Sequence, residues 1–226
     1  MDWGFIHRFT PMYVEAAGLT LSIGLIGIGL SLLVGFGCCM ARYFRVPVLR
    51  PIAKAYIELA RNTPLLVQLF FLYFGLPKVG IRLSAEACAI TGLTFLGGAY
   101  MAEAMRSGIE AVEKSQHESG ACLGLTRWQV LQYIVFPQAF ATAVPAICAN
   151  VIFLIKETSV FSAVALADLM YVAKDLIGMY YKTDEALLML VAAYLVILLP
   201  ISLLFTLLER RMRHAGSGSV RPAEGT

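Results

Sequence analysis

Residues Ala16–Ala41 read AAGLTLSIGLIGIGLSLLVGFGCCMA, without a single charged side chain. An α-helix crosses the hydrocarbon core of a bilayer with about 20 predominantly apolar residues. Lipid offers no hydrogen bonds to the backbone, so one apolar run that crosses it must be helical. This stretch therefore predicts an all-α integral membrane protein.

The rest of the chain has the composition of the same class. Of its 226 residues, 59% are hydrophobic and 15% are charged, against about 45–50% and 25% in soluble domains. Of its further uncharged runs, Asn62–Pro77 and Ala87–Ala102 are short, so to span a membrane they must extend over Ala55–Arg61 and Glu103–Arg106. We predict five transmembrane helices from the first run and four others: Asn62–Pro77, Ala87–Ala102, Trp128–Ile155 and Ala186–Leu208.

The domain boundaries follow from these runs. We expect residues 1–15 to be an external N-terminal segment, residues 16–209 to form the transmembrane domain, and residues 210–226 to be a disordered cytoplasmic tail. The run Trp128–Ile155 is longer than a straight span requires, and Pro137 and Pro145 can break or kink it.

The distribution of basic residues predicts the orientation. Cytoplasmic segments of membrane proteins carry an excess of Lys and Arg. With the N-terminus outside, five basic residues are external (Arg8, Lys78, Arg82, Lys174 and Lys182). Twelve are then cytoplasmic: Arg42, Arg45, Arg50, Lys54, Arg61, Arg106, Lys114, Arg127, Arg210, Arg211, Arg213 and Arg221. We therefore predict an external N-terminus and a cytoplasmic C-terminus.

The segment between the third and fourth spans has helix signals of its own. Ser115 with Glu118 three residues later is typical of a capping box, and so is Thr126 with Gln129. Gly124 lies between them, where the end of a first short helix needs the left-handed backbone conformation. The pattern predicts a helix, a glycine turn and a second helix.

The second of these helices is expected to end at Pro137. Trp128, Leu131 and Val135 recur at helical spacing and predict one apolar face. A loop that only joins two spans needs neither caps nor such a face, so Ser115–Pro137 is interpreted as a rigid docking element for a cytoplasmic partner. The alternative is an amphipathic helix that lies on the membrane.

Here the residues resemble a known family. Glu118 with Gly124 six residues later, followed by Ile134-x-x-Pro137, is similar to the EAA loop of ABC importer permeases, which contains their cytoplasmic coupling helix. Ser119 and Gly120 stand where that pattern has two alanines. Both are small, so close packing is retained.

Three other stretches extend the resemblance to roughly residues 16–209. Glu58–Pro77 resembles the second helix of polar amino acid permeases, with Asn62 where glycine is usual. Ala99–Ile109 resembles their third helix, and Lys156–Ser159 their lysine–acid–threonine–serine stretch. The chain thus looks like a type I importer permease of the polar amino acid uptake family (the histidine, glutamine or arginine type).

The resemblance implies a permease subunit in the cytoplasmic membrane of a bacterium. It implies a second permease, identical or homologous, two ABC ATPase subunits that dock on the Ser115–Pro137 loops, and an external solute-binding protein that delivers an amino acid. The chain itself is expected to bind no cofactor, whereas the partner ATPase uses ATP and Mg²⁺. Membrane lipid surrounds the spans, and no nucleic acid is expected.

Charged and polar residues inside the spans are candidates for the substrate pathway, because such groups are expensive in lipid and face a polar interior. Lys156 and Glu157 lie deepest. As neighbours on a helix they point about 100° apart and do not satisfy each other. The alternative role is an ion pair that ties helices or subunits together. The full set of candidates is Gln68, Lys156, Glu157, Thr158 and Ser159.

Two further charged pairs lie near the cytoplasmic ends of the second and third spans. Glu58 with Arg61, and Glu103 with Arg106, are three residues apart and lie on one helical face. We interpret both as structural ion pairs that hold helix ends or receive the coupling loop.

Several function classes are excluded by what the sequence lacks. It contains no G-x-x-x-x-G-K-[ST] phosphate loop, so no ATPase site is expected in this chain. It shows no nucleophile and base, and no cluster of metal ligands, at a useful spacing. The three His lie in separate polar segments. Two alternatives stay open: an ATP-independent channel or facilitator, and an ABC importer permease for another small polar solute.

Overall fold

The computed structural model describes residues 1–216, and in this range every regular element is a helix. The α-helices are α1 (Trp3–Tyr43), α2 (Leu49–Arg61), α3 (Leu65–Phe70), α4 (Ala85–Glu110), α5 (Lys114–Cys122), α6 (Arg127–Val130), α7 (Phe136–Glu157), α8 (Leu169–Tyr180) and α9 (Thr183–Gly216). Single turns of π-helix occupy Phe71–Gly75 and Leu131–Val135, and 3₁₀ turns occupy Leu76–Val79 and Thr158–Val164. The all-α expectation is confirmed.

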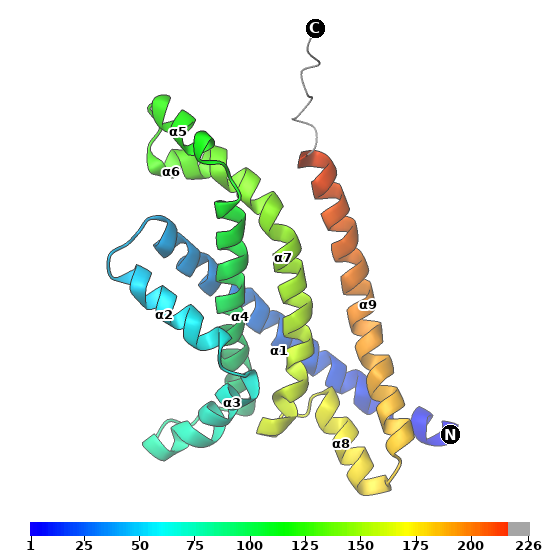
Figure 1. The fold of residues 1–226 in the computed structure, drawn as a ribbon. Coiled ribbons are helices and arrows are strands. Elements are labelled where there is room, and N and C mark those ends of the chain that lie inside the picture. Colours follow the sequence, from blue (N-terminus) through cyan, green and yellow to red (C-terminus); the bar gives the residue numbers. More distant parts are fainter. Residues whose placement is uncertain (217–226) are drawn as a thin grey trace.

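Helix α4 is at the centre of the molecule and packs against α1, α2 and α7 (Figure 1). Its contact with α1 depends on a small residue, because a Cβ atom added at Gly35 would lie 2.6 Å from the Cβ of Met101. Small residues allow such close approach where lipid supplies no hydrophobic force between helices. The main hydrophobic core lies beside this contact and includes Leu93, Leu154 and Phe161.

Three helical stretches of the described chain are long and apolar enough to cross a membrane: Trp3–Tyr43, Arg127–Val164 and Thr183–Met212. The predicted second span is instead a pair of helices, α2 followed by Leu65–Val79, bent by 103°. Counting this pair as one broken span gives four. Helix α4 is not among them, and its uncharged stretch runs from Ala87 to Ala102.

The break between α2 and α3 has a local cause. The segment Arg61–Pro64 contains a proline, which disfavours helical backbone in the residue before it. Helix α2 ends at Arg61, and α3 begins at Leu65 directly after Pro64. The predicted second span, one helix from Ala55 through Pro64 to Pro77, is therefore wrong in that the helix breaks at this proline.

Helix α8 was not predicted. Its buried residues Leu169, Val172, Ala173 and Leu176 recur at helical spacing, and Asp168 caps its first turn by accepting a hydrogen bond from the Tyr171 N–H at 2.8 Å. These signals were present in the sequence, but Lys174 and Asp175 make the segment too polar for a span. It packs against α9 and α1.

Helices α1 and α9 extend beyond both ends of the expected transmembrane domain. Residues 3–15, expected as an external N-terminal segment, form the first turns of α1. Residues 210–216, expected as part of a disordered tail, continue α9. Residues 217–226 of that tail lie outside the described part of the chain. Figure 1 shows α5, α6 and the C-terminal end of α9 at one end of the molecule, with the N-terminus and α8 at the other.

Candidate functional site

The predicted docking element forms two short helices, α5 and α6, joined by a turn. Helix α5 begins at Lys114 after the N-cap residue Glu113, which makes no side-chain capping bond. The Ser115 hydroxyl donates to the Glu113 carboxylate at 3.0 Å. The predicted capping box of Ser115 and Glu118 is therefore wrong, because the helix begins one residue before Ser115.

The turn and the start of α6 agree with the sequence analysis. Gly124 has a φ of +76°, the left-handed conformation expected there. Thr126 and Gln129 form the reciprocal capping box: the Gln129 N–H donates to the Thr126 hydroxyl at 3.3 Å, and the Thr126 N–H donates to the Gln129 side-chain oxygen at 2.9 Å. Both predictions are confirmed.

The buried face of α6 differs in one residue from the predicted one. Leu131 and Val135 are buried, but the third buried side chain is Val130, whereas Trp128 is 56% exposed. Trp128 stacks its ring on Phe44 at the end of α1, with centroids 5.9 Å apart. A local cluster built on the buried face joins the element to the ends of α1 and α4 through Met40, Tyr43, Phe44 and Ile109.

The second predicted helix does not end at Pro137. The chain stays helical from Arg127 through Glu157, with Pro137 in the first turn of α7. The π-helical turn Leu131–Val135 directly precedes it. A proline lacks the N–H that a continuous α-helix requires, and the widened turn absorbs this defect without ending the helix. Helices α6 and α7 are therefore joined in one continuous helical stretch through the π-helical turn.

The charged residues at the end of α4 form a wider network than predicted. The Arg106 guanidinium donates to the Glu103 carboxylate at 2.8 Å, so the predicted pair of these residues is present. Glu103 also accepts a hydrogen bond from Arg42 of α1 and lies 3.9 Å from Arg61 of α2. Arg106 pairs in addition with Glu110. One carboxylate thus connects α1, α2 and α4.

The predicted pair of Glu58 and Arg61 is wrong. Glu58 pairs with Lys54 at 3.8 Å, with both side chains well exposed, and Arg61 faces Glu103 instead. The arginine of α2 turns toward α4 because the buried face of α2 packs there. Arg42 was missed as a partner, since no periodicity links residues 61 positions apart.

Gln68 is buried in α3 and bridges the bend between α2 and α3. Its side-chain N–H group donates to the carbonyl of Thr63 at 3.0 Å and to that of Ala60 at 3.3 Å. Its side-chain oxygen is buried and has no hydrogen-bond partner within residues 1–216. Among the pathway candidates, this oxygen is the one buried side-chain polar atom without a partner in the described chain.

The stretch Lys156–Ser159 lies where α7 passes into the 3₁₀ turn. Lys156 is exposed and Glu157 half-buried, and neither forms an ion pair within the described chain. Thr158 is buried, and its hydroxyl donates to the Ile155 carbonyl at 2.7 Å. The 3₁₀ turn packs against α3, so the structure brings the stretch close to the helix that carries Gln68.

The charged side chains at the end of α4 and the cysteines bear on which ligands the chain could hold. Within the described residues, no group of three or more His, Cys, Asp or Glu could hold a metal ion. The buried cysteines Cys39, Cys88 and Cys148 are free thiols.

Comparison with known proteins agrees with this geometry. Residues 14–214 match the family model described as binding-protein-dependent transport system inner membrane component. The chain is 32% identical over 214 residues to the glutamine transport system permease protein GlnP of Escherichia coli (strain K12). This alignment covers 94% of this chain and 98% of the relative. It is 39% identical over 160 residues to a probable glutamine ABC transporter permease protein of Bacillus subtilis (strain 168), with 71% and 73% covered.

The fold has a close match among solved structures. A crystal structure of an amino acid ABC transporter with histidines aligns with a TM-score of 0.87 at 31% identity, over 93% of this chain and 99% of that one. The architecture is that of a type I ABC importer permease. The chain belongs to the family of binding-protein-dependent transport system inner membrane components.

Proposed function

We propose that this chain is the permease of an ABC importer for a polar amino acid, moved by a separate ATPase that docks on α5 and α6. The observation that carries the proposal is the construction of this element. Its buried face packs on the ends of α1 and α4, while Leu123, Trp128 and Tyr133 stay exposed. Exposed apolar side chains gathered on a rigid support are typical of a protein interaction site.

A displacement of α6 would be transmitted to the membrane domain through the helix that continues from it. Helix α6 continues through the π-helical turn into α7, which ends at Glu157, directly before the 3₁₀ turn that packs against α3. Displacing α6 would therefore displace Lys156 and Glu157 at the end of α7. ATP binding to the partner would select between two packings of the same helices, one open to each side.

An importer of this kind requires several partner proteins. The complex contains two ATPase subunits, which use ATP and Mg²⁺, and a second permease that is identical or homologous to this one. An external solute-binding protein delivers the amino acid. This chain contributes transport and no ATPase site, and it is a multi-pass protein of the inner membrane.

The topology that suits this function has five spans, with the N-terminus outside and the C-terminus in the cytoplasm. Helix α4 would supply the fifth span, with its charged end held by Arg42 and Arg61. The predicted cytoplasmic segments then hold α5, α6 and the end of α9, which lie at one end of the molecule (Figure 1). Cysteine labelling from each side tests this, because Cys122 in α5 is exposed.

Reconstitution tests the function. The permease, its ATPase and its binding protein are placed in proteoliposomes, and uptake of labelled glutamine, arginine or histidine is measured with ATP inside. We expect uptake that requires ATP and the binding protein. Uptake that proceeds without either one would favour a channel or facilitator, and uptake of another solute alone would change the cargo.

A further inference from the structure

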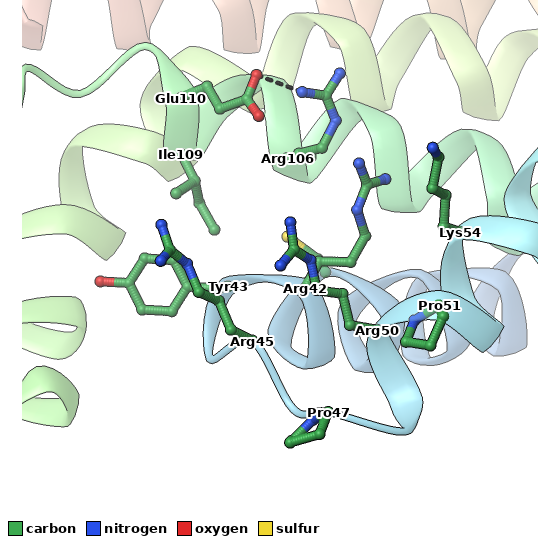
Figure 2. Close-up of a pocket in the computed structure, with 11 residues that line it drawn as sticks. Arg42, Tyr43, Arg45, Pro47, Arg50, Pro51, Lys54, Arg106, Ile109 and Glu110 are labelled. Carbon is green, nitrogen blue, oxygen red and sulfur yellow. Dashed lines mark hydrogen bonds and ion pairs between the residues drawn. The ribbon is translucent and has the colours of Figure 1, made fainter.

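A large basic cavity lies where α1, α2 and α4 meet. It has a volume of about 900 Å³ and is lined by the end of α1, the turn that joins α1 to α2, the start of α2 and the end of α4. Figure 2 shows the side chains of Arg42 of α1, Arg45 of the turn and Arg50 of α2 pointing toward the end of α4. Lys54 and Arg106 are the other two cations of the lining, and Glu110 is its only carboxylate.

Two of these cations have no acidic partner. Arg42 and Arg106 pair with Glu103, and Lys54 lies near Glu58. Within the described chain, no carboxylate oxygen lies within 4.0 Å of the guanidinium of Arg45 or Arg50. The cavity therefore contains an excess of positive charge that the chain itself does not neutralise.

The backbone conformation of Arg45 is a second reason to expect that its side chain binds a ligand in this cavity. Arg45 has a φ of +54°, a left-handed conformation that favours glycine or asparagine. The turn it forms is tight, since the Val46 N–H donates to the Ala41 carbonyl at 3.0 Å. A residue held in this unfavourable conformation is a reason to look for a role of its side chain, and this side chain lines the cavity.

An apolar groove adjoins the basic cavity and shares Cys39 and Ile109 with it. The groove has a volume of about 470 Å³ and runs between α1, α4, α7 and α9, lined almost wholly by apolar side chains such as Phe36 and Phe140. A basic cavity joined to an apolar groove has the chemistry of an amphiphile with an anionic head.

We propose that the cavity binds the phosphate of an anionic phospholipid, with an acyl chain of that lipid in the apolar groove. Guanidinium groups bind phosphate oxygens through paired N–H donors, which suits Arg45 and Arg50. A lipid fits better than a soluble anion for two reasons. Helix α1 is a candidate span, and it ends at Tyr43, which lines the cavity. The apolar side chains of Val48 and Leu49 are exposed beside the cavity. The bound lipid would lie at the base of the docking element, because Phe44 next to Tyr43 stacks on Trp128.

Native mass spectrometry tests the proposal and does not depend on transport. The full-length chain is purified in detergent and incubated with a mixture of phosphatidylglycerol and phosphatidylcholine, and the bound lipids are counted. We expect the wild type to retain phosphatidylglycerol selectively, and R45Q/R50Q to bind it about twentyfold more weakly. K78Q/R82Q, which loses the same charge far from the cavity, should bind like the wild type.

Three results would overturn the proposal: equal retention of both lipids by the wild type, wild-type affinity for phosphatidylglycerol in R45Q/R50Q, or equal losses in R45Q/R50Q and K78Q/R82Q. Inorganic phosphate distinguishes the source. Retention of phosphatidylglycerol in excess phosphate supports the lipid. Displacement, with phosphate binding to lipid-free wild type and not to R45Q/R50Q, assigns a soluble anion instead.

The variants are expected to fold, since neither side chain carries an ion pair. If the unfolding temperature of R45Q/R50Q fell, the single variants R45Q and R50Q would carry the test. Each should bind phosphatidylglycerol about fivefold more weakly than the wild type. Unchanged binding in both would again overturn the proposal.

Discussion

Gly124 joins α5 to α6 through its backbone alone. A Cβ atom added there would meet nothing within 4 Å, so no steric contact requires glycine. What requires it is the φ of +76°. A left-handed conformation costs an L residue about 1–2 kcal/mol, and β-branched residues tolerate it least.

Replacing Gly124 with valine should abolish amino acid uptake and substrate-stimulated ATPase activity, while the protein still inserts into the membrane. Gly124→Asn is the matched control, because asparagine tolerates the left-handed conformation and should retain most activity. Both activities are measured in proteoliposomes. Normal uptake by the valine variant would contradict the role of the turn in coupling.

Asp168 is a second residue whose behaviour follows from its surroundings. Its carboxylate is fully buried between the 3₁₀ turn and α8 and accepts one hydrogen bond, from the Tyr171 N–H. Its second oxygen is buried with no partner in the described chain. Burial raises the pKa of Asp168 from 3.8 to about 6, against the smaller opposing effect of the Tyr171 N–H.

This pKa predicts the pH dependence of stability. Between pH 3.8 and about 6 the folded protein holds a proton on Asp168 that the unfolded chain has lost. The free energy of unfolding therefore falls as the pH rises through this window, by up to about 3 kcal/mol. Asp168→Asn keeps the N-cap and removes the titration, so its unfolding temperature should depend less on pH in that window.

Asp2→Asn is the control with the opposite sign. The Phe5 N–H is the main group that lowers the pKa of Asp2, so Asp2 adds stability above its ordinary pKa that is lost as the pH falls. Equal pH profiles for wild type and Asp168→Asn would show that Asp168 titrates normally.

Among the helices, the three that meet at Glu103 act as a unit. Glu103 of α4 accepts a hydrogen bond from Arg42 of α1, pairs with Arg106 of its own helix and lies near Arg61 of α2. The Glu103 side chain is 20% exposed. Removing its charge would leave half-buried guanidinium groups without their partner, which costs more than the loss of a surface pair.

Glu103→Gln should lower the free energy of unfolding by about 1–3 kcal/mol. The matched control is Glu58→Gln, whose ion pair with Lys54 is exposed and should contribute less than about 1 kcal/mol. Thermal unfolding of the purified protein in detergent measures both. Equal losses of stability in the two variants would show that the network is not a clamp between helices.

Local sequence signals placed some helix ends correctly and others not. The capping box of Thr126 and Gln129 and the glycine turn before it were found, because both depend on residues within four positions of one another. Pro137 was expected to end a helix, yet the π-helical turn before it lets the helix continue. That compensation depends on how α6 packs on α1 and α4, which local preferences do not contain.

In the molecule as a whole, the pathway candidates gather where α3 meets the end of α7. Leu65 and Leu69 of α3 share a buried cluster with Phe161 and Val164 of the 3₁₀ turn. Lys156 and Glu157 lie directly before that turn and form no ion pair within the described chain. Lys156 and Glu157 therefore do not tie two helices of the described chain together through an ion pair. Their role in the substrate pathway stays a prediction.

Lys156→Met and Glu157→Gln should each weaken the apparent affinity for the amino acid by about tenfold, since each removes a charge that a zwitterion would meet. The amount of folded protein should not change, because neither side chain is paired. Lys174→Met, which loses a cation from α8, is the control. Uptake kinetics and protein yield are measured together, and reduced yield with unchanged affinity would favour a structural role.

The sequence by itself determined the membrane class, the position of most helices, the glycine turn, one capping box and the family. These depend on hydrophobicity along the chain and on backbone preferences, which act over a few residues. Only the tertiary structure decided the 103° bend between α2 and α3, the contact of Arg42 with Glu103 and the basic cavity beside it. A charged side chain takes its partner from whatever packing places beside it, and Arg42 finds its partner 61 residues away.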